Sequence, residues 1–417
     1  MRFIHTSDWH LGQTLHNFER GFEHQCFLDW LLDTLVAEQA DGLLVAGDVF
    51  DTANPSAAAQ KQLYRFLQQA KARVPHLNTV IIAGNHDSPG RLEAPGPLLE
   101  TLDATVIGCV PRLPDGSIDV QRLVVPLKNR QGEVAAWALA VPFLRPGDVP
   151  RVENSVDPYQ DGIALLYHQA LTYALRHRQP GQALVALGHC HMVGGQTSSD
   201  SERSIVIGGS EALPSGMFDS QVAYAALGHL HLAQRVGGQH HLRYCGSPLP
   251  LSFAEVAYPH QVLRVDLQGD AVSAITPLRV PRAVDLLRVP AQPAPLPDVL
   301  AALKALALPE QVDPQRHPYL EVRVRLDAPE PGLRSQIEAA LAPHAVRLAK
   351  IETSFAASAG TQGTAAHTSL DALEQLQPAA VFDQLYRSKY NTDTPAALSA
   401  AFAELLLADE ADGVGSL

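Results

Sequence analysis

The sequence contains no apolar run long enough to cross a membrane. Its N-terminus, Met1–His5, begins a strand pattern at once and lacks the hydrophobic region of a signal peptide. We therefore expect a cytoplasmic protein without membrane contact. Cysteine is scarce and shows no Cys-x-x-Cys spacing, so we expect reduced thiols that mostly fill the core, at Cys26, Cys109, Cys190 and Cys245.

The sequence also has little positive charge, and its formal net charge is -13. This acidic balance argues against simple electrostatic binding to nucleic acid, which needs a basic surface. Two circumstances weaken the argument, because carboxylates that bind metal are neutralised by the cation and because a partner chain could supply basic surface. The sequence has no Gly-rich phosphate loop ending in Gly-Lys-Ser/Thr, so any ATP binding must come from a partner.

The chain of 417 residues is too long for one ordinary core, so we expect two or three folding units. Strand and helix patterns alternate at its start, and this order predicts parallel strands with right-handed crossovers, at 2–6, 42–46 and 79–83. Shorter apolar runs within 105–143, such as 123–125 and 135–141, predict a second sheet. Further strands are expected at 183–187, 223–227 and 261–267.

The character of the sequence changes at about residue 280, where a small α+β unit is expected. The proline-rich stretch 289–297 predicts either a linker or an exposed edge. Residues 356–369 are rich in small and polar residues and predict a flexible tether. The expected domains are a core of 1–275, a capping α+β domain of 276–355, a linker of 356–370 and a helical tail of 371–417.

The tail carries two amphipathic helical patterns, one around Phe382 and Leu385 and one around Leu398 and Phe402. Two such helices on a flexible tether cannot bury their apolar faces alone, so docking on a partner is the favoured interpretation. The alternative is that both helices pack back on the main domain.

Five apolar runs end in residues that can bind metal, and the first such residue follows a glycine in four of them. The residues concerned are Asp8 and His10, Asp48, Asn85 and His86, His189, and His229 and His231. Each motif alone is also typical of a polar turn or of a packed histidine. Because the carboxyl ends of strands meet at one edge of an α/β sheet, the whole set favours one crevice.

About seven ligands are too many for one metal ion and suit two, with one carboxylate bridging them. Metal ions held in this way can activate a water molecule and stabilise both the attacking and the leaving oxygen of a phosphoryl transfer. Mixed oxygen and nitrogen ligation suits manganese, iron or zinc better than magnesium alone. The sequence therefore predicts a hydrolytic site with two divalent metal ions.

These motifs resemble the signature of the calcineurin-like metallophosphoesterases. Three stretches are similar, more narrowly, to the SbcD family of bacterial nuclease subunits, at 4–12, 47–51 and 246–253. The resemblance implies an α/β fold, a two-sheet metallophosphoesterase sandwich flanked by helices, with a small α+β capping domain and a C-terminal helical tail.

The resemblance also implies roles for the motif residues. One metal would be held by Asp8, His10, Asp48 and His231, and the other by Asp48, Asn85, His189 and His229, with Asp48 bridging. His86 would face the phosphodiester without binding metal, and Asp87 would orient it. The role of His191, which follows His189 at the spacing of the His229 and His231 pair, stays open.

The activity implied is that of a DNA nuclease with two divalent ions, in the first place Mn²⁺. It would be a double-strand exonuclease and single-strand endonuclease that processes DNA ends and hairpins in replication, recombination and repair. It would act as a homodimer joined through its C-terminal helices to a coiled-coil ATPase of the SbcC type. Arg91, Arg112 and Arg145 are candidates for DNA contact because they lie near motif loops.

Two other functions are considered. One is a phosphatase or phosphodiesterase of the same fold that acts on a small substrate. Protein phosphatases of this fold carry an Arg shortly after the Gly-Asp motif, whereas this chain continues with Thr52, Ala53 and Asn54. The other is a scaffold with a relic site, which the complete set of ligand positions disfavours.

Overall fold

The computed structural model describes residues 1–196, 212–308, 313–328 and 330–355, and five single positions, Phe382, Tyr386, Thr394, Pro395 and Leu398. The chain divides into two compact units, Met1–Ala356 and Ala357–Leu417. The predicted linker and the predicted helical tail lie outside the described residues, apart from those five positions. None of the described helices is both long and apolar enough to cross a membrane.

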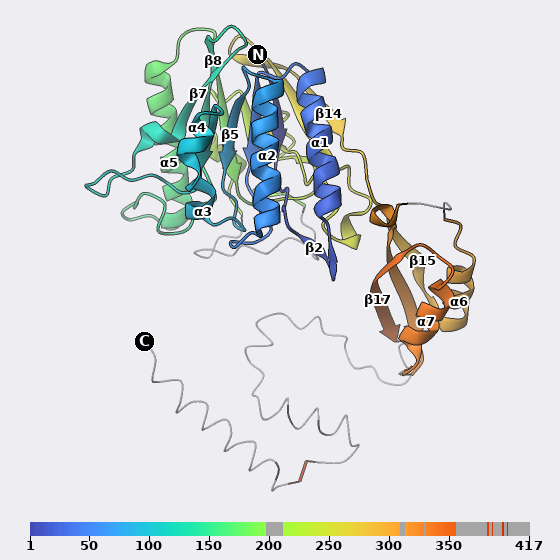
Figure 1. Ribbon diagram of the computed structural model, residues 1–417. Helices are drawn as coiled ribbons and strands as arrows, with labels where there is room; N and C mark the ends of the chain where they lie inside the picture. The colour runs from blue at the N-terminus through green and yellow to red at the C-terminus, as the bar shows by residue number, and fades with distance from the viewer. Residues whose placement is uncertain are drawn as a thin grey trace. The chain divides into compact units, whose positions relative to one another are not determined.

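The first sheet has six strands in the order β14-β13-β1-β4-β5-β6 (Figure 1). Four of them are parallel, namely β1 (Arg2–Thr6), β4 (Gly42–Ala46), β5 (Asn78–Ile82) and β6 (Ala104–Ile107). Two antiparallel strands complete it, β13 (Gln261–Gln268) and β14 (Ala271–Arg279). The three strands predicted near the N-terminus are confirmed.

The second sheet also has six strands, in the order β11-β12-β10-β9-β8-β7. They are β7 (Val124–Lys128), β8 (Val134–Ala140), β9 (Ala183–His189), β10 (Tyr224–Gly228), β11 (Gln234–Arg235) and β12 (Leu242–Tyr244). The prediction for 105–143 is correct for β7 and β8 but wrong for β6. The short helices α3 (Pro89–Glu93) and α4 (Gly96–Glu100) return the chain to the first sheet, where β6 pairs with β5.

The two sheets pack face to face, and helices cover their outer faces. Along β4, Leu44 and Ala46 point into the core between the sheets, whereas Leu43 and Val45 pack under α1 (Gly21–Ala37) and α2 (Ala57–Arg73). The other sheet is covered by α5 (Pro158–His177). Because both faces of these strands are buried, their sequences are continuous apolar runs, which is why they could be located from sequence.

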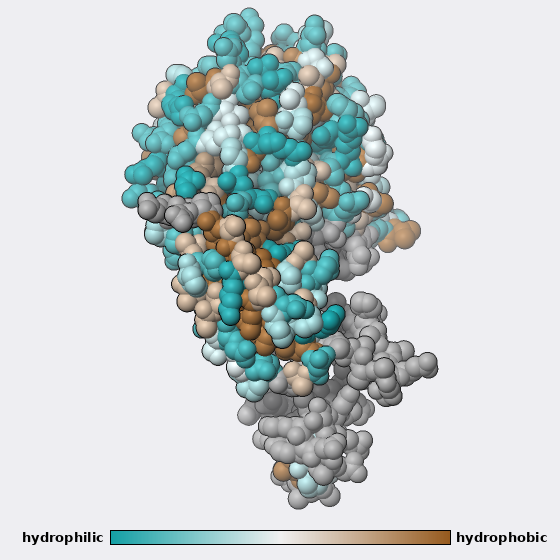
Figure 2. Space-filling model, turned by 90° about the vertical axis from the view of Figure 1, so that its right-hand side faces the viewer, coloured by the Kyte–Doolittle hydropathy of each residue, from teal (hydrophilic) through white to brown (hydrophobic). Residues whose placement is uncertain are grey.

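A small α+β unit follows the sandwich. Its parallel sheet contains β15 (Leu286–Pro295), β16 (Tyr319–Leu326) and β17 (Arg347–Phe355), and one face packs on α6 (Leu296–Lys304) and α7 (Leu333–Leu341). The proline-rich stretch therefore forms an edge strand, not a linker, since prolines are tolerated where no partner strand needs their N–H. Apolar side chains gather in a band over this unit (Figure 2).

The division of the chain at residues 275 and 276 stays a prediction. That position lies inside β14, whose pairing with β13 reaches Arg279. The remaining elements are the hairpin of β2 (Thr14–Leu15) and β3 (Phe18–Glu19), and short 3-10 helices at Val120–Leu123, Ser215–Met217, Phe253–Glu255 and Pro314–Arg316.

Candidate metal centre

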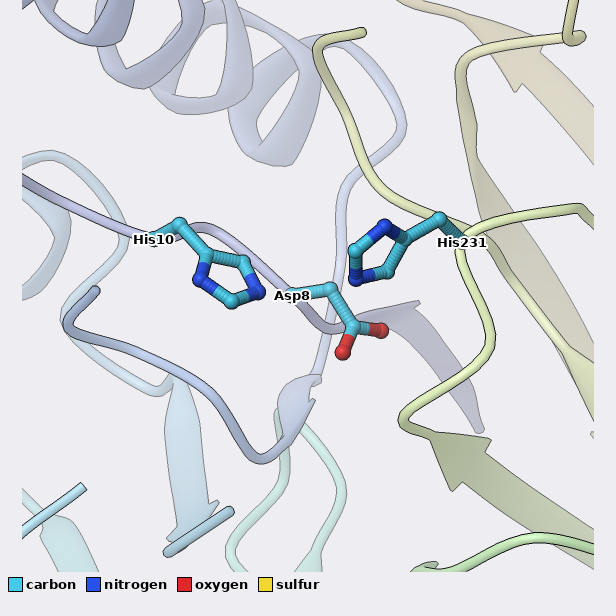
Figure 3. A group of neighbouring side chains, drawn as sticks. All are labelled: Asp8, His10 and His231. Carbon is cyan, nitrogen blue, oxygen red and sulfur yellow. The ribbon is translucent and has the colours of Figure 1, made fainter. Parts of the chain in front are cut away.

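The predicted ligands come together at the carboxyl ends of β1, β4, β5, β9 and β10, as the parallel arrangement requires. In three overlapping groups, one potential ligand atom from each member lies within 4.8 Å of the others. The groups are Asp8, His10 and His231; His10, Asp48 and His86; and Asp8, Asp48 and His189. In the first group, Asp8 lies between the rings of His10 and His231 (Figure 3).

The buried carboxylate of Asp48 connects the two halves of this cluster. Its Oδ2 atom lies 3.6 Å from His10 Nε2 and 3.4 Å from His189 Nε2. On the far side, Asn85 Oδ1 lies 3.0 Å from His189 Nε2 and 3.2 Å from His229 Nδ1. All seven predicted ligands and His86 therefore belong to one continuous cluster with Asp48 near its centre.

Three of the histidines are held by their Nδ1 atoms, which leaves Nε2 directed into the cluster. His10 Nδ1 pairs with Asp51 Oδ1 at 3.2 Å, and His231 Nδ1 pairs with Glu255 Oε1 at 2.7 Å. His189 Nδ1 is 2.8 Å from the main-chain oxygen of Ala46. Metal-binding histidines are held in this way, because a second partner fixes the tautomer and the ring orientation.

The backbone around the site is strained at the ligands themselves. Asp8, His10 and Asp48 have φ angles of 54°, 47° and 48°, and His229 has a φ angle of 102°. Residues with a Cβ rarely adopt such angles, and they persist where the surrounding structure holds them. Strain at four of the seven candidate ligands indicates that the loops are shaped by the site.

The loops also hold one another's carboxylates. The N–H of His229 donates to Asp8 Oδ1 at 3.0 Å, and the N–H of His86 donates to Asp48 Oδ1 at 2.9 Å. Each carboxylate is thus fixed by the loop that supplies another candidate ligand. Among the described residues, His10 Nε2 is buried without a hydrogen-bond partner. A buried nitrogen without a partner, facing two carboxylates, fits a metal ion, because an unsatisfied polar atom is otherwise costly.

The electrostatics suit cation binding. Burial alone would raise the pKa of Asp48, but the neighbouring His189, His10 and His86 hold it well below its ordinary value. Burial lowers the pKa of His229 well below its ordinary value, so this ring is neutral at pH 7. Burial also lowers the pKa of His189, yet the charge of Asp48 overrides it and raises that pKa to about 9. A metal ion would therefore displace a proton from His189 on binding.

The structure corrects the role predicted for Asp87. Its carboxylate accepts the N–H groups of Gly84, Val49 and Phe50, at 2.9, 3.1 and 2.9 Å. His86 Nδ1 lies instead 2.7 Å from the main-chain oxygen of Asp51. Asp87 therefore ties the loop after β5 to the loop after β4, and His86 is oriented by the backbone.

Sequence reasoning missed two residues that hold ligands. Asp51 stands in the motif 47–51 but received no role, and Glu255 lies just beyond the motif 246–253. Both are acidic residues near recognised motifs, although sequence alone does not show that they face His10 and His231. His191 lies outside the three groups, with its ring centre 6.4 Å from that of His229.

One of the three candidate arginines lies close to the cluster. The guanidinium of Arg145 lies over the ring of Phe143 at 5.5 Å, and that ring in turn is 6.3 Å from the ring of His189. Arg112 instead donates to the main-chain oxygens of Gly116 and Gly147, and Arg91 is an exposed residue of α3.

Comparison with known proteins agrees with this geometry. Residues 1–233 match the model of the calcineurin-like phosphoesterases, and residues 282–390 match the type 5 capsule protein repressor C-terminal domain, SbcD_C. The D subunit of nuclease SbcCD from Rhodobacter capsulatus is 42% identical over 84% of this chain and 86% of its own length. The chain belongs to the calcineurin-like phosphoesterase family and, within it, to the SbcD proteins.

Other members of the family are more distant. The D subunit of nuclease SbcCD from Escherichia coli K12 is 38% identical over 67% of this chain and 68% of its own. That of Bacillus subtilis is 34% identical over 64% and 66%. A dimetal phosphatase from Danio rerio aligns with 67% of this chain and 99% of its own at 12% identity, and its TM-score of 0.37 is too low to add to the assignment. The phosphoesterase fold implies a site for two divalent metal ions, which the cluster fits.

Gly84→Ala is expected to reduce the metal content of the purified protein. A Cβ at this position would overlap the Asp48 carboxylate and its main-chain nitrogen, so Asp48 would have to move. Gly90→Ala is the matched control, because no atom lies within 4 Å of a Cβ at that position. Elemental analysis after equilibration with Mn²⁺ measures the difference. Equal metal content in the two variants would contradict this account of the site.

Proposed function

We propose that this chain is the nuclease subunit of an SbcCD-type complex and cleaves DNA with two divalent metal ions, most suitably Mn²⁺. One observation carries the proposal. The metal-capable residues of five strand ends lie in one cluster, in a chain 42% identical to the D subunit of an SbcCD nuclease. The activity is double-strand exonuclease and single-strand endonuclease, for the processing of DNA ends and hairpins.

The proposed ligand sets share Asp48. Asp8, His10, Asp48 and His231 hold one ion, and Asp48, Asn85, His189 and His229 hold the other. The position of Asp48 Oδ2 between the Nε2 atoms of His10 and His189 supports its bridging role. When bound, the two ions activate a water molecule and stabilise the attacking and leaving oxygens of the phosphodiester.

His86 is the proposed catalytic residue outside the ligand sets. Its Nδ1 is held by the main-chain oxygen of Asp51, and its ring centre lies 4.8 Å from that of His10. Its side chain is partly exposed, whereas His10 and His189 are buried. His86 is therefore placed to donate a hydrogen bond or a proton to the phosphodiester oxygens as negative charge develops there.

The partners are proposed on other grounds. The names of the relatives include a second subunit, and this chain has no phosphate loop of its own, which supports an ATPase partner of the SbcC type. The amphipathic pattern of 371–417 supports docking of that partner on the tail. A core of 1–275, a cap of 276–355, a cytoplasmic location and a homodimer complete the proposal.

The purified chain is expected to cleave linear duplex DNA with Mn²⁺, and Asp48→Ala is expected to lose this activity, because it removes the bridging carboxylate. A small phosphodiester and a phosphomonoester are tested in parallel. Turnover of the small esters alone, also after addition of the ATPase partner, would favour a small-substrate phosphodiesterase.

His86→Ala is expected to retain both metal ions and to lose DNA cleavage by about a hundredfold or more, as befits a residue acting by proton transfer. Elemental analysis and cleavage rates are measured on the same sample. Loss of a metal ion in this variant would show that His86 is a ligand.

Deletion of 379–408 is expected to abolish co-purification with the ATPase partner and to leave the Mn²⁺ content unchanged. The reason is that the proposed docking helices lie in this segment, whereas every proposed ligand precedes residue 232. Retained co-purification would refute the docking role of the tail.

A further inference from the structure

The small α+β unit meets the sandwich close to the metal centre. A buried apolar cluster contains Leu15 of the β2–β3 hairpin and Phe253 of the loop after β12, packed with Val284, Leu286 and Tyr319. The hairpin follows directly after His10, and the loop contains Glu255, which holds His231. The unit thus contacts both segments that continue from the ligands of one proposed metal ion.

The contact contains a buried polar chain that begins at Tyr319, the first residue of β16. Its hydroxyl donates to Glu23 Oε1 at 2.9 Å, and Glu23 is paired through both carboxylate oxygens with Arg20, at 2.9 and 2.6 Å. All three side chains are almost fully buried. Burial and the charge of Glu23 raise the pKa of Tyr319 to about 12, so its hydroxyl remains a donor.

The chain continues from Arg20 toward the metal centre. Arg20 Nη1 donates to the main-chain oxygen of Pro250 at 2.6 Å and to Gln13 Oε1 at 2.8 Å. Gln13 Nε2 in turn donates to the main-chain oxygen of Leu251 at 2.8 Å. Arg20 therefore fixes the main chain of the loop at two adjacent residues.

The last links reach a proposed ligand. The N–H of Leu251 donates to Glu255 Oε2 at 2.7 Å, and Glu255 Oε1 pairs with His231 Nδ1 at 2.7 Å. Glu255 is fully buried. Its two oxygens thus connect the loop fixed by Arg20 to the ring of His231.

We propose that Tyr319 and Glu255 are positioning residues through which the small α+β unit holds His231, and with it one of the two metal ions. The inference rests on the ligand sets proposed above. The other ion is independent of this chain of bonds, because His189 is held by Ala46 within the sandwich and His229 and Asn85 contact each other there. A movement of the α+β unit would therefore change the affinity for one ion and leave the other in place.

The test measures Mn²⁺ binding to the full chain, from the electron paramagnetic resonance signal of the free ion. Tyr319→Phe removes one hydroxyl and keeps the apolar packing. We expect it to weaken one site about fivefold to tenfold and to leave the other unchanged, since an unsatisfied buried acceptor remains at Glu23. Glu255→Gln is expected to weaken the same site about tenfold to a hundredfold.

Tyr64→Phe is the matched control, because Tyr64 is a partly buried residue of α2 whose hydroxyl lies outside this chain of bonds, and it is expected to bind as the unmodified chain does. Thermal unfolding of each variant reports on folding separately, and weakening confined to one site is a readout that a general loss of structure would not give.

His231→Asn separates the inference from its premise. If this variant loses one Mn²⁺ while Tyr319→Phe binds both as tightly as the control, the positioning role is refuted and the ligand sets stand. If His231→Asn keeps both ions at unchanged affinity, the ligand sets themselves are refuted, and the inference falls with them. DNA cleavage is not needed for either result.

Discussion

The buried carboxylate of Asp48 is the constraint on which the rest of the structure depends. It is surrounded by imidazoles, and a carboxylate in such a place is stable only if positive charge faces it. The protein supplies this charge in part through His189, and a metal ion completes it. Every other feature of the site keeps these groups at fixed positions, since a cation bound between side chains from distant strands has no other support.

That support comes from the way the loops are joined. The N–H groups of His86 and His229 fix the carboxylates of Asp48 and Asp8, and Asp87 ties together the loops after β4 and β5. Left-handed backbone at the ligands is tolerated because neighbouring loops hold it from several sides. The metal centre is therefore as rigid as the sandwich beneath it.

Sequence reasoning located the strands and the ligands because both leave strong local signals. A strand buried on both faces, such as β4, is a continuous apolar run, and a glycine before Asp48 marks a sharp turn into the site. The roles of Asp87 and Glu255 left no such signal. Asp87 is adjacent to His86 in sequence but faces the backbone of another loop, and Glu255 meets His231 only after the chain has folded. For the same reason β6 was misplaced, since a short apolar run does not show which sheet it joins.

The order of the strands along the chain has a consequence for synthesis on the ribosome. The ligands span Asp8 to His231, Glu255 comes later, and β1 is completed on one side only by β13, which ends at Gln268. A growing chain shorter than this holds its first ligands on an incomplete sheet and has no site that could bind two metal ions. The hydrolytic centre thus arises in one late step, and a partly made chain carries no premature nuclease.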